Sequence, residues 1–118
     1  MTPTRETGAI DLTIATSVAR GWHVLTVTGE LDLASAPLLT QRLQAVPDGA
    51  AVALDLSEVT FIDSSGLGAI VSVDARLTER GGRLAVIAPE RGAVDRLVAL
   101  TGLDQIVAVV RSRGDLGS

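Results

Sequence analysis

Residues 50–56 read A-A-V-A-L-D-L, and residues 60–68 read T-F-I-D-S-S-G-L-G. The first stretch is a nearly continuous apolar run, which is typical of a β-strand covered on both faces of a sheet. In the second, two serines and two glycines stand where a helical pattern begins, with apolar residues at helical spacing as far as Leu77. A buried strand, a short connection and an amphipathic helix together predict an α/β fold.

Outward from this unit the chain alternates strand and helix patterns. The elements that we expect are strands at 10–15, 22–28, 50–56, 84–88 and 106–110, and helices at about 36–46, 64–80 and 93–100. We expect Gly29 to end the second strand, Ser35 to cap the first helix, and Gly102 to end the third helix in a left-handed conformation. The order β-β-α-β-α-β-α-β predicts a mixed β-sheet opened by a hairpin, with helices packed mainly on one face.

The chain has 118 residues, which fits a single domain. We expect a flexible N-terminus at residues 1–8, the domain at residues 9–111 and a polar C-terminal tail at residues 112–118. Aromatic residues make up only 2% of the chain, so Val, Leu, Ile and Ala must form most of the core. Trp22 and Phe61 are expected to fill gaps in that core.

The composition excludes several kinds of chemistry. There is no cysteine, and all ten basic residues are arginine, so disulfides, thiolate catalysis and lysine Schiff bases are excluded. The net charge is −4 and the arginines are scattered, which argues against nucleic acid or a membrane surface as a partner. No apolar run is long enough to span a bilayer, and the N-terminus lacks the apolar core of a signal peptide. We therefore expect a cytoplasmic protein. The sequence leaves the oligomeric state open, and we take a monomer as the default.

An enzyme is not expected either. Neither serine of D-S-S-G has glycines two residues away on both sides, as a nucleophile elbow requires. The single histidine, His23, lies in a predicted strand, and no other base for neutral pH can be named. The carboxylates of Asp55, Glu58 and Asp63 could approach one another, but capping and turn roles explain them without a metal. We predict no catalytic residue, no cofactor and no metal.

Two roles for the serine pair remain open from the residues alone, and they are compatible. Asp63 or Ser64 at a helix N-cap would bind the free N–H groups of the first turn. A hydroxyl at that place would also be exposed, and the small residues Gly66 and Gly68 would let a kinase approach it as a phosphate acceptor.

The segment D-L-S-E-V-T-F-I-D-S-S-G-L-G, residues 55–68, resembles the signature of the bacterial anti-sigma factor antagonists. These belong to the STAS (sulfate transporter and anti-sigma factor antagonist) domain family. G-E-L-D at residues 29–32 and L-V-A-L-T-G-L at residues 97–103 match two further family motifs in register. The resemblance covers essentially the whole chain and implies the STAS fold.

The resemblance also implies a switch between partners. The unmodified protein would bind an anti-sigma factor that is also a serine kinase of the histidine-kinase-like ATPase type, and so free a sigma factor. That kinase would phosphorylate Ser64, the residue after the motif aspartate, and a metal-dependent serine/threonine phosphatase would reverse the modification; ATP belongs to the kinase. The family's docking surface maps onto seven residues: Glu30, Asp32, Asp63, Ser65, Gly66, Leu67 and Gly68. The alternative is a STAS scaffold or transport-associated subunit that is never phosphorylated.

Overall fold

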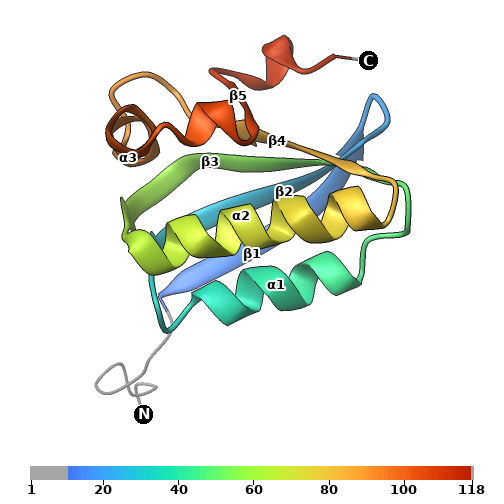
Figure 1. Ribbon diagram of the computed structural model, residues 1–118, viewed down its shortest axis with the longest axis horizontal. Coiled ribbons are helices and arrows are strands. Elements are labelled where there is room, and N and C mark those ends of the chain that lie inside the picture. Colours follow the sequence, from blue (N-terminus) through green and yellow to red (C-terminus); the bar gives the residue numbers. More distant parts are fainter. Residues whose placement is uncertain (1–10, 118) are drawn as a thin grey trace.

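A computed structural model describes residues 11–117, so the expected flexible N-terminus lies outside the described residues. Five strands form one sheet in the order β1-β2-β3-β4-β5, with the helices on its crossovers (Figure 1). The strands are β1 (Leu12–Ala19), β2 (Trp22–Leu31), β3 (Ala51–Ile62), β4 (Arg83–Ile87) and β5 (Ala108–Val110). The helices are α1 (Ala36–Gln44), α2 (Ser64–Glu79) and α3 (Ala93–Thr101), with short 3₁₀ turns at Leu103–Gln105 and Arg113–Asp115.

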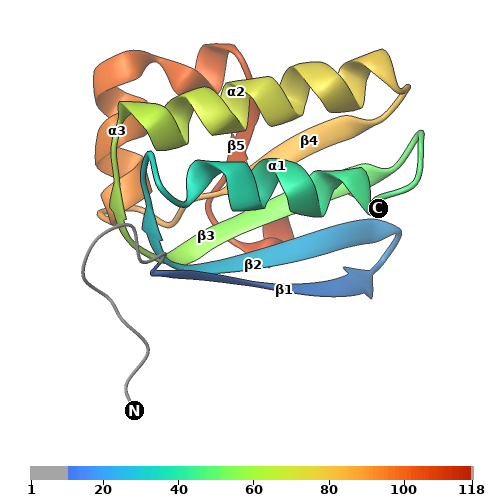
Figure 2. The same ribbon diagram turned by 90° about the horizontal axis from the view of Figure 1, so that it is seen from below.

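The sheet is mixed in the way that the element order predicts. β1 pairs antiparallel with β2, and β2, β3, β4 and β5 are mutually parallel. α1 and α2 lie side by side on one face of the sheet, and both views show them covering its central strands (Figures 1 and 2). α3 packs chiefly against β3. The mixed α/β architecture with its opening hairpin is thereby confirmed.

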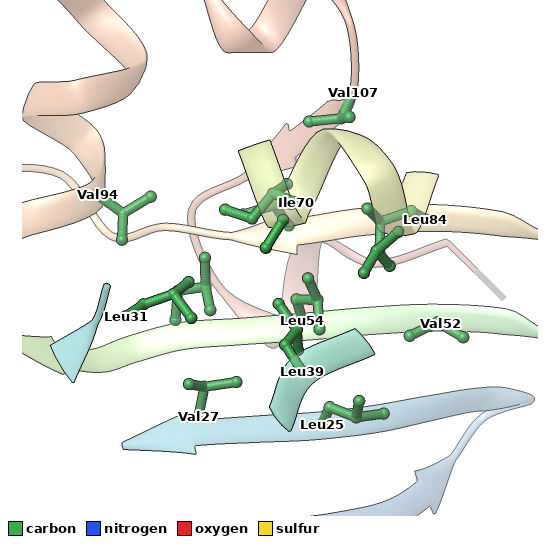
Figure 3. Packing of buried hydrophobic residues seen from close by; sticks show 14 of the residues in the cluster. Leu25, Val27, Leu31, Leu39, Val52, Leu54, Ile70, Leu84, Val94 and Val107 are labelled. Atoms are coloured by element: carbon green, nitrogen blue, oxygen red, sulfur yellow. The ribbon is translucent and has the colours of Figure 1, made fainter. Parts of the chain in front are cut away.

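Alternation along each strand separates two apolar layers. Side chains such as Leu25 on β2 and Leu54 on β3 face the helices, where they meet Leu39 of α1 and Ile70 of α2 (Figure 3). These four side chains are at most 1% exposed. The aliphatic core expected from the composition therefore lies between the sheet and the helices.

The opposite face of the sheet carries a smaller apolar cluster around Trp22, which is buried as predicted. The C-terminal segment covers it: Leu116 is buried there, and the Trp22 indole N–H donates to the carbonyl of Gly117. The guanidinium of Arg83 lies 4.5 Å from the centre of the Trp22 ring. Residues 113–117, for which a polar tail was expected, thus pack against the sheet.

Asp55 fixes the C-terminal segment to the sheet. Its carboxylate is buried on the Trp22 face and accepts from Arg113 Nε at 2.7 Å and from the Ser57 hydroxyl. Arg113 also donates to the Thr26 hydroxyl at 2.7 Å. Burial by itself raises the pKa of Asp55, but the hydrogen bonds from Ser57 and Arg113 outweigh it and hold the pKa below its usual value.

Several strand ends differ from the prediction: β1 continues to Ala19, β5 begins only at Ala108, and two further differences bear on the corner between β2, β3 and α2. Gly29 does not end β2: it has φ +112° within the strand, where an added Cβ would lie 2.2 Å from the Asp11 carbonyl oxygen. β3 does not end at Leu56 but continues to Ile62. The pairing of β3 with β2 is interrupted twice. β3 has one extra residue opposite the β2 step from Thr26 to Thr28, and another opposite the step from Gly29 to Glu30. Such bulges break the simple alternation by which strands are recognised in a sequence.

The helix termini agree better. α2 begins at Ser64 as predicted, and α3 ends at Gly102 with φ +72°, the left-handed conformation that glycine adopts without steric cost. Leu103 then turns back into the core, where it is 1% exposed.

Candidate functional site

The ends of β2 and β3 and the start of α2 meet at one corner of the molecule. In the parallel register Glu30 lies beside Phe61 and Leu31 beside Ile62. The N–H of Asp63 donates to the carbonyl of Leu31 at 3.3 Å, which ties the β3–α2 junction to β2. Because the carboxyl ends of parallel strands share an edge, the G-E-L-D and D-S-S-G motifs lie next to each other although 30 residues separate them in sequence.

Asp63 is the N-cap of α2. Its Oδ1 accepts from the N–H groups of Ser65 at 2.9 Å and Gly66 at 3.1 Å, which satisfies two donors of the first turn. Of the two cap candidates, the structure therefore selects the aspartate. Ser64 is instead the first helical residue, and its exposed hydroxyl makes no hydrogen bond with any residue from 11 to 117. Its backbone is fixed while its side chain is free.

The two glycines of the first turns have different roles. A Cβ on Gly66 would lie 2.5 Å from the Leu31 carbonyl oxygen and 2.8 Å from the Ile62 Cγ1 atom. Gly66 is buried and allows α2 to approach the ends of β2 and β3, so it does not clear space around the serine as the sequence had suggested. Gly68 is exposed, and a Cβ there would meet no atom within 4 Å. Between them, Leu67 packs against the core, and Ser65, which precedes Gly66, is partly buried.

Asp32 organises the loop between β2 and α1. Its Oδ1 accepts from the backbone N–H of Ser35 at 3.1 Å and from the Ser35 hydroxyl at 3.0 Å. The Ser35 hydroxyl also accepts from the N–H of Asp32 and, in an alternative orientation, reaches the carbonyl of Glu30 at 2.7 Å. Ser35 occupies the N-cap position of α1 but makes no cap hydrogen bond to that helix. Ser35 is thus the N-cap residue of α1, as predicted, but its buried hydroxyl bonds backward to the loop and not to the helix.

The predicted site residues therefore lie at one corner, where Glu30, Asp32 and Asp63 are each partly buried and Ser64 is exposed. His23, by contrast, lies near the opposite end of β2, where it pairs with Val18 and Val52. Within residues 11–117 no group of three acidic, histidine or cysteine residues could hold a metal ion. Over the same range, no helix combines the length and the apolar character that crossing a membrane demands.

Sequence reasoning missed one feature of this corner. Phe61 was expected in the core but is 48% exposed, because β3 extends beyond β4 and this part of the strand pairs with β2 alone among the described strands. Phe61 lines a hollow of about 260 Å³ between the end of β3 and α3, together with Thr60, Ile62, Ala93, Arg96, Leu97 and Leu100. The sequence contains one signal of this hollow: Leu97 and Leu100 add further apolar positions to a helix in which Val94 and Val98 are buried.

A sequence model of the family described as "Mlab, STAS domain" matches residues 14–110. The chain belongs to the STAS domain family. The resemblance in the D-S-S-G-L-G segment is thereby confirmed at the level of the family.

Relatives of this STAS domain have names that describe regulatory proteins. It is 34% identical over 95 residues to the anti-sigma-B factor antagonist of Listeria monocytogenes, covering 76% of this chain and 80% of that protein. An anti-sigma factor antagonist from Mycobacterium paratuberculosis has a similar crystal structure, with a TM-score of 0.73, 33% identity and coverage of 88% and 89% of the two chains. These names describe antagonists of another protein, which supports the prediction that this STAS domain is not an enzyme.

The fold is also shared with SpoIIAA of Bacillus, whose structures are described as an unphosphorylated and a phosphorylated form. They match with TM-scores of 0.64 and 0.62 and cover 87% and 86% of this chain, and 92% and 95% of those chains. Their identities of 17% and 20% make this a likeness of fold alone.

Proposed function

We propose that this STAS domain is an anti-sigma factor antagonist controlled by phosphorylation of Ser64. The unphosphorylated form binds an anti-sigma factor that is also a serine kinase, and a sigma factor is released. The observation that carries the proposal is the exposed Ser64 hydroxyl, which stands free at the first residue of a capped helix. The names of the relatives supply the class of partner.

The proposed docking surface surrounds Ser64. Glu30 and Asp32 at the end of β2 contribute carboxylates, and Asp63, Ser65, Gly66, Leu67 and Gly68 form the β3–α2 junction. The open space at Gly68 supports close approach of a partner at this turn. Three carboxylates on the segments that meet at this corner make it acidic, so a basic surface on the kinase fits it.

Phosphorylation would act on the interface rather than on the fold. A phosphate adds about −1.5 to −2 charges, and the N-terminus of a helix accommodates such an anion at little cost. The partner surface would instead meet a bulky dianion beside the Asp63 carboxylate. Like-charge contacts in an interface cost several kcal/mol, and about 3 kcal/mol corresponds to a hundredfold loss of affinity.

The catalytic groups of the switch belong to other proteins. The kinase, of the histidine-kinase-like ATPase type, brings ATP and the base that deprotonates Ser64, which explains why the serine needs no base beside it in this chain. A metal-dependent serine/threonine phosphatase removes the phosphate and restores binding. We place the exchange in the cytoplasm and take this chain as a monomer.

The test combines intact mass with binding. The protein is incubated with ATP and each candidate anti-sigma kinase from its own source, and the mass is measured before and after. We expect one phosphate, absent in Ser64→Ala and retained in the matched control Ser65→Ala. Titration calorimetry should then show that the phosphorylated protein binds the kinase at least a hundredfold more weakly.

Two results would contradict the proposal. A phosphate that persists in Ser64→Ala places the modification elsewhere, and equal affinity of both forms removes the switch. If no kinase modifies the protein, the alternative gains support, namely a STAS scaffold or transport-associated subunit that is never phosphorylated. Near-ultraviolet circular dichroism of the phosphorylated protein should be unchanged, since loss of the tertiary signal would indicate unfolding instead.

A further inference from the structure

α3 carries two apolar stripes where packing on the sheet needs only one. Val94 and Val98 point into the core and are 2% and 4% exposed. A second stripe of Ala93, Leu97 and Leu100, at spacings of four and three residues, lines the hollow beside β3. Ala93 and Leu97 are partly buried, whereas Leu100 is 79% exposed, so the end of this stripe has no cover within residues 11–117.

The other wall of the hollow is the end of β3, formed by Thr60, Phe61 and Ile62. Phe61 supplies an aromatic surface that is 48% exposed, opposite the second stripe of α3. Asp63 and Ser64 follow this wall directly in the chain, so the hollow lies next to the proposed docking surface. We call it the α3 groove.

One cation lines the α3 groove. Arg96 stands on the same stripe as Ala93 and Leu100, three residues after the one and four before the other. Its guanidinium forms no ion pair or hydrogen bond with any residue that the structure describes, although its helix neighbour Asp95 is paired with Arg111 at 2.6 Å. An apolar wall with one unpaired cation at its side is complementary to an apolar side chain beside a carboxylate.

We propose that the α3 groove docks a segment of the anti-sigma factor in which an apolar side chain adjoins a glutamate or aspartate. The apolar side chain inserts between Phe61 and Leu100, and the carboxylate binds Arg96. The identity of the partner rests on the proposed function, whereas the chemistry of the segment rests on the groove alone. The groove gives a partner that recognises Ser64 a second anchor.

The lining of the α3 groove favours a protein segment as its occupant. Its volume is about 260 Å³. Aromatic and arginine side chains are the residues that most often dominate the energy of protein interfaces.

The first experiment requires no anti-sigma factor. The ¹⁵N-labelled chain is titrated with two short amphipathic peptides that are identical except that one carries leucine with glutamate and the other leucine with lysine. We expect the acidic peptide to shift the amide signals of residues 60–62 and 93–100 and to bind more tightly than the basic one. Arg96→Gln should weaken the acidic peptide two- to fivefold and abolish the difference between the peptides.

Leu100→Ser should weaken both peptides about tenfold. The matched control is Val18→Ala, at an exposed apolar position on the opposite end of the sheet (68% exposed), which should leave binding unchanged. Absence of shifts at residues 60–62 and 93–100, or equal binding of both peptides to the unsubstituted chain, would overturn the proposal. A dimer that Leu100→Ser dissociates in sedimentation velocity would identify a second copy as the occupant and would also overturn it.

The second experiment uses the kinase identified by its modification of Ser64. Arg96→Gln and Leu100→Ser should weaken its binding by the same factors, and unchanged affinity would contradict the proposal. These experiments distinguish failure of the proposed function from failure of the groove proposal. Peptide binding without any phosphorylation leaves the groove in place and removes the switch, whereas phosphorylation without peptide binding removes the groove alone.

Discussion

Replacing each of the two glycines at the start of α2 by alanine should change stability in opposite directions. At Gly68 the added methyl group meets open space, whereas at Gly66 it would lie 2.5 Å from the Leu31 carbonyl oxygen. That oxygen belongs to the backbone of β2 and cannot rotate away. Relief of the contact therefore requires α2 to move from the strand ends, or β2 to shift.

The expected magnitudes follow from these contacts. Alanine is favoured over glycine within a helix by up to about 1 kcal/mol, so Gly68→Ala should raise the free energy of unfolding by that amount. Gly66→Ala has a similar gain, but forcing a methyl group into a packed site costs about 1–3 kcal/mol. Because the helix preference largely cancels between the two variants, Gly66→Ala should be about 1–3 kcal/mol less stable than Gly68→Ala.

Equilibrium unfolding in urea measures the difference, and the fluorescence of Trp22, the one tryptophan in the chain, reports it. The slope of the free energy with urea concentration should agree among the unsubstituted protein and both variants, so that the midpoints can be compared. If Gly66→Ala proves as stable as Gly68→Ala, the close approach of α2 to Leu31 does not exist. The account of how Ser64 is held in place would then fail.

Two further predictions concern the carboxylates that hold the structure together. Asp55→Asn should lower the free energy of unfolding by about 1–3 kcal/mol at pH 7. Because the pKa of Asp55 is lower in the folded than in the unfolded protein, its stabilisation is present above the unfolded pKa and is lost as pH falls through the folded pKa. The difference in free energy of unfolding between Asp55→Asn and the unsubstituted protein should therefore narrow below about pH 4. A difference in thermal stability that stays constant from pH 7 to pH 2.5 would refute this account. Asp63→Ala should cost about 1 kcal/mol through loss of the α2 cap and Asp63→Asn much less, as urea titration can test; equal losses would exclude the cap as the cause.

Most of the fold follows from local patterns in the sequence. The β3–α2–β4 unit could be predicted because an apolar run, a helical stripe and the glycine pair at residues 81–82 succeed one another within short distances. Errors arose where a strand has neighbours on one side only. Beyond Leu56, β3 pairs with β2 alone, so exposed residues interrupt its apolar pattern and a connecting loop was predicted instead.

The candidate site could be predicted in its residues more fully than in its geometry. Ser64 and Asp63 follow from helix-start chemistry, and the nearness of Glu30 follows from parallel pairing of the strands. The role of Gly66 could not be predicted, since its neighbour is the carbonyl of a residue 35 positions earlier. The exposure of Phe61 depends on where β4 ends, and the anchoring of residues 113–117 depends on Arg113 reaching Asp55 across the sheet. Such long-range contacts leave no periodic signal in a sequence.

The location of Ser64 within the first turn of α2 also bears on the rate at which a binding partner can be exchanged. The Asp63 cap and the packed Gly66 fix the backbone on both sides of the serine, so no loop has to become ordered when another molecule docks. Ordering of side chains and loops at an interface costs free energy, about 0.5–1.5 kcal/mol for each side chain immobilised. At this corner the backbone is ordered before binding, so the cost of ordering a loop does not arise. Under the proposed function, association at this corner would be governed by diffusion and by the charges of Glu30, Asp32 and Asp63, and its rate should fall as salt is added.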